Sequence, residues 1–406
     1  MAFKIDNGQL SKLILNDRYN RFVFSTPQSY PVYLVGGYLR DLLKQKVSRD
    51  RDYVTGGDLE SLLVRVVAGT GGKLVKIGNC LHRVVLKDNS TLDFTPMENR
   101  IVDDLGRRDF TINSLAWSPG TGLIDPHGGS QDLVKESIRM ISKDNIENDP
   151  IRILRAYRFA GEFGMRIEKR TRRALKNLSF KLIDAKGERI TLEFFKILNL
   201  DSVSKILRMM FHDQVLKHII SLTDGELRAR LTAVSRVRRL FNAIPLKEKN
   251  RRSVAFSQNL FYEGLIPLEI LLEGKPACAL KMSSRILRRL NDVERGRLIL
   301  SRGNWSADSL FEAFEAMQDA AVDFLLQKGR NELLSEYERY RTIKKKALLS
   351  THEIVLATNV RGGHILGRMI RALRQAEFNR QISCKEDALL FLKAIDIIYH
   401  NISYRS

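Results

Sequence analysis

The sequence predicts an α+β fold, with a mixed sheet and its helices in the first third of the chain and an all-α remainder. Two observations predict it. Short β-rich runs separated by glycine turns extend from Tyr33 to about Ser137, whereas from Ile138 onward apolar residues recur at helical spacing. With 406 residues, the chain is long enough for two or three domains with separate cores.

The composition is strongly basic. The chain carries 68 Lys and Arg residues against 47 Asp and Glu residues, a formal net charge of +21. A generic basic surface is one explanation, but an excess of this size favours a polyanionic partner, most simply nucleic acid.

The cysteines exclude two classes of protein. Cys80, Cys278 and Cys384 are far apart and have neither the pattern of a disulfide framework nor the spacing of a zinc site.

No apolar run approaches the length of a membrane span, and the first residues lack a secretory leader. We therefore expect a soluble cytoplasmic protein with no membrane partner.

A glycine turn begins the first motif. The apolar run Tyr33–Val35 ends at Gly36 and Gly37, and the amphipathic segment Tyr38–Lys46 follows, which predicts a strand, a tight turn and a helix. Such a turn can offer backbone N–H groups to a phosphate, and Arg40 is a candidate clamp one turn into the helix.

Acidic residues follow on two predicted strands. Asp50 and Asp52 stand two apart, so both carboxylates point to one face, and a neighbouring strand supplies Asp93. Carboxylates placed side by side repel unless a cation lies between them, and these hard oxygen ligands suit Mg²⁺. Each motif alone is weak evidence, because most Gly-Gly pairs are turns and most Asp-x-Asp pairs are solvated. In this order they describe a nucleotidyltransferase palm.

Polar residues are interspersed with apolar ones from Asp103 to Ala116. A structural helix can have this pattern. However, Arg108 and Asn113 carry donors that suit a ribose or a phosphate. We therefore include both among the candidate nucleotide-binding residues.

A later helix is predicted to begin with Asn148 or Asp149 as its cap and Pro150 in its first turn. Arginines recur along it every three residues: Arg152, Arg155 and Arg158. They can form a solvated stripe. Alternatively, Asp149 and Arg152 held together can hydrogen-bond the edge of a base and act as a protein template.

These segments together closely resemble the class II tRNA nucleotidyltransferase and bacterial poly(A) polymerase family. The resemblance extends from Tyr33 to about Leu198, with a weaker match at Arg361–Ile370. The motifs that carry it are Val35–Asp41, Arg49–Asp52, Arg107–Asn113, Asp125–Gly129 with Asp132 and Leu133, Asp149–Phe159, and Glu188–Ile190 with Glu193.

The resemblance implies a domain organisation. An N-terminal extension (1–30) precedes a nucleotidyltransferase head (31–138) and a nucleotide-selecting helical neck (139–200). A helical body (201–345) and a helical tail that binds tRNA (346–406) then complete an elongated molecule.

The resemblance also implies roles for the candidate residues. Asp50 and Asp52 bind the catalytic metals, with Asp93 as the third carboxylate. Asp149 and Arg152 read the base of CTP or ATP. The residues expected to contact the nucleotide are these two with Gly36, Gly37, Arg40, Arg108, Asn113, Arg155 and Arg158. Two positions depart from the family pattern: Asn148 stands where Glu is usual, and Ser114 where Ala is usual.

The implied activity is template-independent addition of C and/or A residues to the 3′ end of tRNA, from CTP and ATP, with release of pyrophosphate. CC-only addition, A-only addition and poly(A) synthesis share these motifs. A non-catalytic tRNA-binding protein is the alternative from another class, and the intact carboxylates argue against it. Basic clusters beyond residue 200 suggest a track for the tRNA acceptor arm: Arg228–Arg230, Arg236–Arg239, Arg251–Arg252 and Arg285–Arg289.

Overall fold

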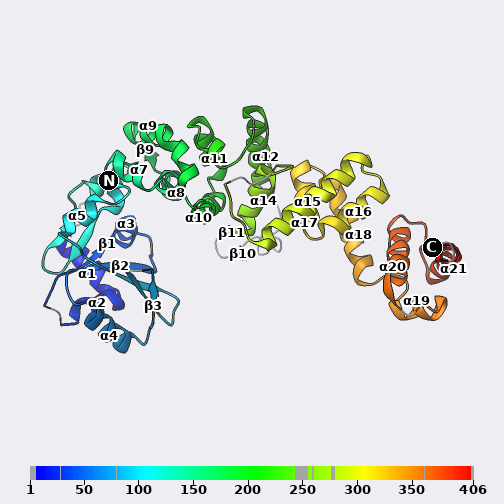
Figure 1. The fold of residues 1–406 in the computed structure, drawn as a ribbon, viewed down its shortest axis with the longest axis horizontal. Coiled ribbons are helices and arrows are strands. Elements are labelled where there is room, and N and C mark those ends of the chain that lie inside the picture. Colours follow the sequence, from blue (N-terminus) through cyan, green and yellow to red (C-terminus); the bar gives the residue numbers. More distant parts are fainter. Residues whose placement is uncertain are drawn as a thin grey trace. The chain divides into compact units, whose positions relative to one another are not determined.

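The computed structural model describes residues 6–27, 29–78, 80–242, 255–257, 260–275, 279–360 and 362–403. The chain forms two compact units, Met1–Ile219 with Cys278–Leu280, and Ile220–Ala277 with Lys281–Ser406 (Figure 1). The α+β class is confirmed, with a mixed sheet in the first unit and helices after it. The division into five domains stays a prediction.

A seven-stranded sheet organises the first unit, in the order β3-β4-β5-β2-β1-β6-β7. Only the pair β2 and β5 is parallel, and the other neighbours are antiparallel. The strands are β1 (Val32–Val35), β2 (Asp50–Thr55), β3 (Lys73–Ile77), β4 (Leu81–Val85), β5 (Thr91–Pro96), β6 (Ala116–Ser118) and β7 (Gly122–Ile124).

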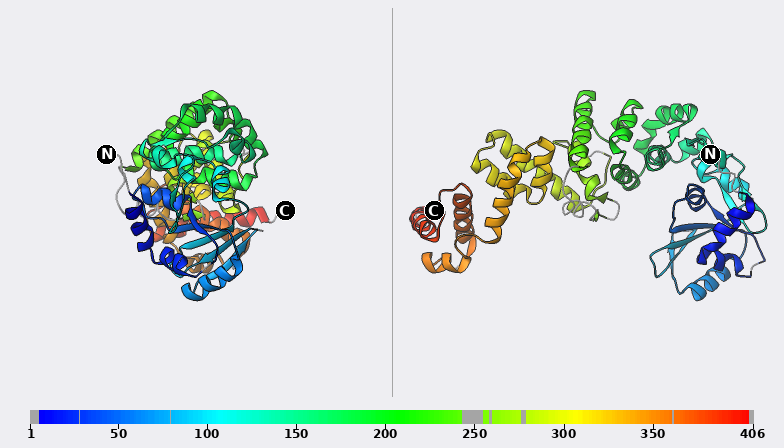
Figure 2. Two further views of the ribbon diagram at one scale, coloured as in Figure 1. Left: turned by 90° about the vertical axis from the view of Figure 1, so that its left-hand side faces the viewer. Right: turned by 180° about the vertical axis from the view of Figure 1, so that it is seen from behind.

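Three helices cover one face of this sheet: α1 (Asn7–Asn16), α2 (Arg18–Ser25) and α4 (Leu59–Thr70). The right-hand view of Figure 2 shows the blue helices α1 and α2 lying over the sheet. The ring of Phe24 contacts Tyr53 and Trp117 at 6.0 and 5.1 Å, and Tyr53 stacks on Phe94 at 4.9 Å. Because side chains alternate along a strand, the residues between these aromatic ones point to the opposite face.

Short helices follow the strands. They are α3 (Gly37–Leu43), α5 (Ile101–Gly106), η1 (Thr111–Asn113) and α6 (Gly129–Val134). The helix expected over Tyr38–Lys46 ends at Leu43, because the chain turns at Gln45, which has a φ of 57°.

Helices complete the first unit: α7 (Lys143–Asn148), α8 (Ile151–Phe163), α9 (Lys169–Leu178), η2 (Ser179–Asp184), α10 (Gly187–Leu198), α11 (Val203–His212) and η3 (Leu216–His218). The expectation of uninterrupted helix after Ile138 is wrong. A parallel pair forms between β8 (Ser137–Ile138) and β9 (Arg166–Ile167), because Gly164 ends α8 with a φ of 70° and the chain extends afterwards.

Two apolar clusters are described in the second unit. One lies within residues 300–378 and the other within residues 349–392. Its elements are α12 (Asp224–Asn242), β10 (Ala255–Ser257), β11 (Leu260–Phe261), α14 (Tyr262–Leu271), α15 (Ser284–Arg302), α16 (Ala307–Met317), α17 (Ala320–Lys328), η4 (Asn331–Leu333), α18 (Leu334–Lys345), α19 (Thr351–Thr358), α20 (Gly363–Phe378) and α21 (Lys385–Ser403). None of the helices in the described ranges has the length and apolar character needed to cross a membrane.

Two of the basic clusters contain arginines that are part of the protein interior. Arg289 is 6% exposed and pairs with buried carboxylates, and Arg230 donates to the carbonyl oxygens of Leu271 and Glu273 at 2.7 and 2.6 Å. These two arginines therefore stabilise the fold. They do not contribute to the basic surface that was predicted to bind the tRNA acceptor arm. The cluster Arg251–Arg252 lies outside the described residues, as do Cys278 and Arg361.

Candidate active site

The three predicted carboxylates lie on one face of the sheet. Asp50 and Asp52 occupy alternate positions of β2, and the parallel register of β2 and β5 places Asp93 directly beside Asp52. Residues paired in this way point to the same side of a sheet. This is the face that α1, α2 and α4 leave uncovered. The hydroxyl of Thr91 donates to Asp50 at 3.0 Å.

The surroundings of Asp52 disfavour its negative charge. Burial, with the neighbouring charge of Asp93 as the second cause, raises the pKa of Asp52 to about 6, although Arg108 opposes this shift. A positive charge placed beside Asp52 and Asp93 would relieve the repulsion between the two carboxylates.

Asp93 forms an ion pair with Arg83 that the sequence analysis did not predict. Nε and Nη2 of Arg83 on β4 donate to its two carboxylate oxygens at 2.7 and 2.6 Å. Within the described part of the chain, no three Asp, Glu, His or Cys side chains are arranged to hold a metal ion, and this includes the three carboxylates of the sheet. The roles of Asp50 and Asp52 as metal ligands, and of Asp93 as the third, therefore stay predictions.

Gly36 allows the close approach of an arginine. It has a φ of 71°, and a Cβ built on it would lie 2.5 Å from Nη1 of Arg108. Its N–H donates to the carbonyl oxygen of Leu115 at 2.9 Å, so this N–H does not face a phosphate as the glycine motif suggested. Glycine is needed here for its positive φ and its missing side chain.

Most of the predicted nucleotide-binding residues line a single cavity of about 540 Å³. Gly36 and Asp93 are not part of its lining. The predicted residues that line it are Gly37, Arg40, Asp50, Asp52, Arg108, Asn113, Asp149, Arg152, Arg155 and Arg158. The lining also includes residues that were not predicted: Tyr38, Asp41, Ser48, Asp109, Phe159, Glu162, Arg189 and Lys196.

Arg40 is buried and bonded to neighbouring elements, whereas the sequence suggested that its guanidinium would hold a phosphate. Its Nε and Nη2 donate to Asp41 at 2.9 and 2.7 Å, and its Nη1 donates to Oδ1 of Asn113 at 2.6 Å. Its guanidinium also lies over the rings of Phe159 and Phe163 on α8. It therefore holds α3, η1 and α8 together at the edge of the cavity.

Asp109 organises the arginine side of the cavity. Its carboxylate accepts from Nδ2 of Asn113 at 2.9 Å and from Nε of Arg155 at 2.7 Å. Burial alone would raise the pKa of Asp109, but the charge of Arg155 and these hydrogen bonds hold it below its ordinary value. Asp109 stands between Arg108 and Phe110, so the local sequence gives no signal for this role, which follows from its burial because a buried carboxylate requires partners.

Asp149 is held between two arginines. Its Oδ2 lies 3.8 Å from Nε of Arg152 and 2.9 Å from Nη2 of Arg189. The expectation that Asn148 or Asp149 caps the next helix is wrong, because α8 begins at Ile151 with Pro150 at its N-cap and no side-chain cap. The carboxylate of Asp149 is thus directed to the arginines.

The two departures from the family pattern are accommodated. Asn148 is exposed at the last residue of α7, so a shorter side chain removes no buried contact. The buried hydroxyl of Ser114 donates to the carbonyl oxygen of Leu105 at 3.0 Å, which satisfies the added polar group.

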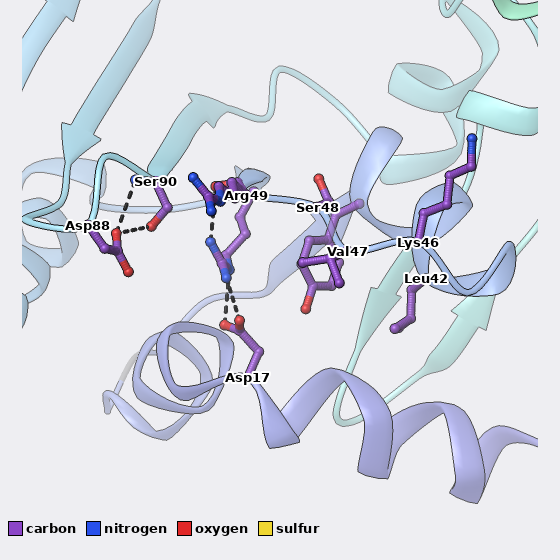
Figure 3. A pocket seen from close by; sticks show the side chains of 10 residues that line it. Asp17, Leu42, Lys46, Val47, Ser48, Arg49, Asp88 and Ser90 are labelled. Atoms are coloured by element: carbon purple, nitrogen blue, oxygen red, sulfur yellow. Dashed lines mark hydrogen bonds and ion pairs between the residues drawn. The ribbon is translucent and has the colours of Figure 1, made fainter. Parts of the chain in front are cut away.

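Arg51, between the two carboxylates of β2, points to the opposite face. Its Nε donates to Asp17 at 2.9 Å, and its Nη2 also bonds that carboxylate. Asp17 and Arg51 both line a second cavity of about 330 Å³, and Figure 3 shows dashed lines that end at the carboxylate of Asp17. Arg51 therefore joins β2 to the start of α2, on the face of the sheet opposite Asp50 and Asp52.

Comparison with known proteins identifies two regions. Residues 32–139 match the model of the poly A polymerase head domain, and residues 164–226 match that of the probable RNA and SrmB-binding site of polymerase A. The matched head domain contains all three carboxylates and the glycine turn.

Individual proteins resemble the chain over different lengths. The CC-adding tRNA nucleotidyltransferase of Geobacter sulfurreducens is 29% identical over 397 residues, 89% of this chain and 91% of that protein. The A-adding tRNA nucleotidyltransferase of Deinococcus radiodurans is 35% identical over 159 residues, 37% and 34% of the two chains.

A solved structure resembles nearly the whole fold. The Thermotoga maritima CCA-adding enzyme, complexed with tRNA, has a TM-score of 0.72 and 25% identity, and the match covers 97% of this chain and 96% of that one. By its motifs, its fold and these relatives, the chain belongs to the class II tRNA nucleotidyltransferase and bacterial poly(A) polymerase family.

Proposed function

We propose that the protein is a tRNA 3′-end nucleotidyltransferase that adds C and/or A residues from CTP and ATP without a nucleic-acid template. One observation carries the proposal: a single cavity contains Asp50 and Asp52 at one part of its lining and Asp149, Arg152 and Arg189 at another. The first pair is suited to a metal-bound triphosphate and the second group to a base. The names of the relatives support the same activity.

Different side chains of the cavity would bind the triphosphate and the base. In the reaction, the 3′-oxygen of the RNA forms a bond to the α-phosphorus, and the bond to pyrophosphate breaks. Arg108 and Arg155 face the cavity and offer positive charge to the triphosphate. Asp149, oriented by Arg189 and Arg152, can accept from an exocyclic amino group, and the arginines can donate to ring acceptors.

A divalent cation belongs to this family's chemistry, and we propose that it is Mg²⁺. Asp50 and Asp52 would hold it, with Asp93 as a third ligand when it is released from Arg83. When bound, the ion neutralises triphosphate charge and lowers the pKa of the attacking hydroxyl.

CC addition is the product we favour within this activity. The CC-adding relative of Geobacter sulfurreducens is 29% identical over 89% of this chain, a CCA-adding relative is 24% identical over the same share, and the A-adding relative matches 37%. Complete CCA addition, which shares the same sequence motifs, is the second candidate, supported by the fold match to a CCA-adding enzyme. Action in the cytoplasm stays a prediction from the cysteine pattern and the tRNA substrate.

The decisive experiment offers purified protein with tRNAs that lack the last three, the last two or only the last nucleotide, and an unstructured RNA, each with CTP or ATP. We expect incorporation of C into the first two tRNAs and no incorporation of A into the third, whereas incorporation of A there as well would identify complete CCA addition. Incorporation of A alone, polymerisation on the unstructured RNA, or tRNA binding without incorporation would identify the other candidates.

The metal assignment has its own test. Asp50→Ala and Asp52→Ala are expected to lower incorporation at least about a thousandfold, because each removes charge that would hold the cation, while tRNA binding measured by filter retention stays within about threefold. Near-normal turnover in either variant would refute the assignment.

A further inference from the structure

The strand register extends the catalytic face well beyond the carboxylates. Pairing places Asp52, Asp93, Arg83 and Val75 in one row across β2, β5, β4 and β3. The adjacent row is Asp50, Thr91, Val85 and Lys73. Both rows point to the side of the sheet opposite α1, α2 and α4.

The outer part of this face is open. Every residue of β3 is exposed, and Val75 and Ile77 are each 39% exposed although they are large and apolar. The side chain of Arg83 is 38% exposed. We call Lys73, Val75, Ile77 and Arg83 the acceptor platform. Apolar side chains beside cations on an exposed strand suit a ligand that has both flat apolar groups and negative charge.

The cavity of about 540 Å³ lies beside Asp52 on the side away from the acceptor platform. Its lining comes from α3, β2, α8, α10 and the loops near them, and none of its residues belongs to β3, β4 or β5. In-line displacement at phosphorus places the attacking oxygen opposite the leaving group. With a triphosphate in the cavity, the attacking hydroxyl therefore arrives from the side of β5, β4 and β3.

We propose that the acceptor platform binds the last nucleotides of the single-stranded 3′ end of the RNA. This inference rests on the proposed function. Lys73 and Arg83 contact backbone phosphates, and Val75 and Ile77 support a base. Positive charge that tracks a phosphate backbone and an apolar support for bases are the two elements of single-strand binding that does not depend on sequence.

Arg83 belongs to the acceptor platform and also contacts Asp93, the predicted third metal ligand. Its Nε and Nη2 bind Asp93, while its Nη1 carries two further N–H donors. A phosphate bound at Nη1 places a second negative charge beside the guanidinium and draws it away from Asp93. In this way, arrival of the RNA end frees a carboxylate next to Asp52, so Arg83 acts as a positioning residue for the acceptor and for Asp93.

The alternation of β3 supplies a matched control. Lys73 and Val75 belong to the platform, whereas Leu74 and Lys76 are exposed on the opposite face of the same strand. The double variants Lys73→Gln with Val75→Ser and Leu74→Ser with Lys76→Gln remove one charge and one apolar side chain each. Both change exposed positions, so their effects on folding are comparable.

The measurement compares two RNAs, an acceptor-stem hairpin with a single-stranded 3′ tail and the same hairpin without it. We expect the platform variant to bind the tailed hairpin about tenfold more weakly, with the slope of log Kd against log salt reduced by about one, and the hairpin without a tail normally. Its KM for RNA should rise while its KM for CTP stays unchanged. The control variant should resemble the wild type within about twofold.

A photoreactive thiouridine at the 3′ terminus of the tailed hairpin gives an independent readout, and we expect its crosslink within residues 73–85. Equal behaviour of the two double variants, or a crosslink elsewhere, would overturn the platform while leaving the proposed function intact. Loss of incorporation in the wild-type protein, by contrast, would overturn the function itself.

Discussion

At the scale of single residues, the position of Arg108 depends on Gly36. Nη1 of Arg108 occupies the space that a Cβ on Gly36 would need, and its Nε and Nη2 are tied to Asp104 at 3.2 and 3.0 Å. The guanidinium cannot retreat without breaking these bonds. A methyl group at residue 36 therefore changes the charge that faces Asp52 and the cavity.

We expect Gly36→Ala to raise the KM for the nucleoside triphosphate about tenfold, because a charge-assisted contact worth about 1.5 kcal/mol is displaced. Steady-state kinetics with CTP measures this. Gly329→Ala is the matched control: Gly329 has a nearly equal φ of 69° in the second unit, but nothing lies within 4 Å of the position that its Cβ would take. Both variants should lose about 1 kcal/mol of stability, and only the first should change KM.

At the scale of elements, the junction of α7 and α8 positions Asp149, the residue that we propose reads the base. Pro150 separates the two helices and leaves Asp149 with a φ of −138° and a ψ of 88°, outside both helices. Arg189 on α10 then fixes the carboxylate at 2.9 Å. If Asp149 reads the base as proposed, base selection depends on the packing of α7, α8 and α10 and on no single motif.

We expect Asp149→Ala or Arg152→Ala to reduce the preference between CTP and ATP at least about tenfold, and Arg189→Ala to do so in part, because Asp149 then keeps only its more distant partner. Ratios of kcat/KM for the two triphosphates measure the effect, with tRNA affinity as the control. An unchanged preference in the Asp149 variant would contradict the template interpretation.

A second element-scale feature is a buried ionic network in the second unit. Arg289 on α15 contacts Glu269 at 2.6 Å, Asp319 at 3.3 Å and also Asp323, whose carboxylate accepts from Tyr262. One guanidinium thus serves two fully buried carboxylates that come from α14 and α17. Arg289→Met should destabilise the unit by about 3–5 kcal/mol, measured by urea unfolding, because it leaves those charges unpaired.

The same network predicts a pH dependence. Burial raises the pKa of Asp323 and of Glu269 above the ordinary range, although Arg289 opposes the shift. The folded state therefore holds more protons than the unfolded state above about pH 4, and stability falls as the pH rises through the raised values. Asp323→Asn should flatten this fall between about pH 5 and about pH 8, as measured by urea unfolding. A wild-type protein that gains stability over the same interval would contradict the assignment.

At the scale of the whole molecule, the net charge of +21 sets the dependence of RNA binding on salt. Many of the arginines are paired with carboxylates, as Arg155 is with Asp109 and Arg158 with Glu193, so the number of free phosphate contacts is smaller than the charge suggests. With about four such contacts, tRNA affinity should fall about a hundredfold between about 50 and 200 mM salt. Binding that is independent of salt would exclude a phosphate-based interface.

Local patterns in the sequence determined the elements around the site. The alternation in Asp50-Arg51-Asp52 placed two carboxylates on one face, and the glycine pair marked the turn after β1. These predictions succeeded because each depends on bonds and side-chain directions within a few residues of chain.

Only the tertiary structure determined which side chains contact one another across the site and the second unit. The register of β4 and β5 brings Arg83 to Asp93, the packing of α10 on α8 brings Arg189 to Asp149, and burial turns Arg289 from an expected surface cation into the centre of a network. Such contacts join residues far apart in the chain. Strand order and helix packing are set by the sum of many weak apolar contacts, and no short pattern of residues encodes that sum.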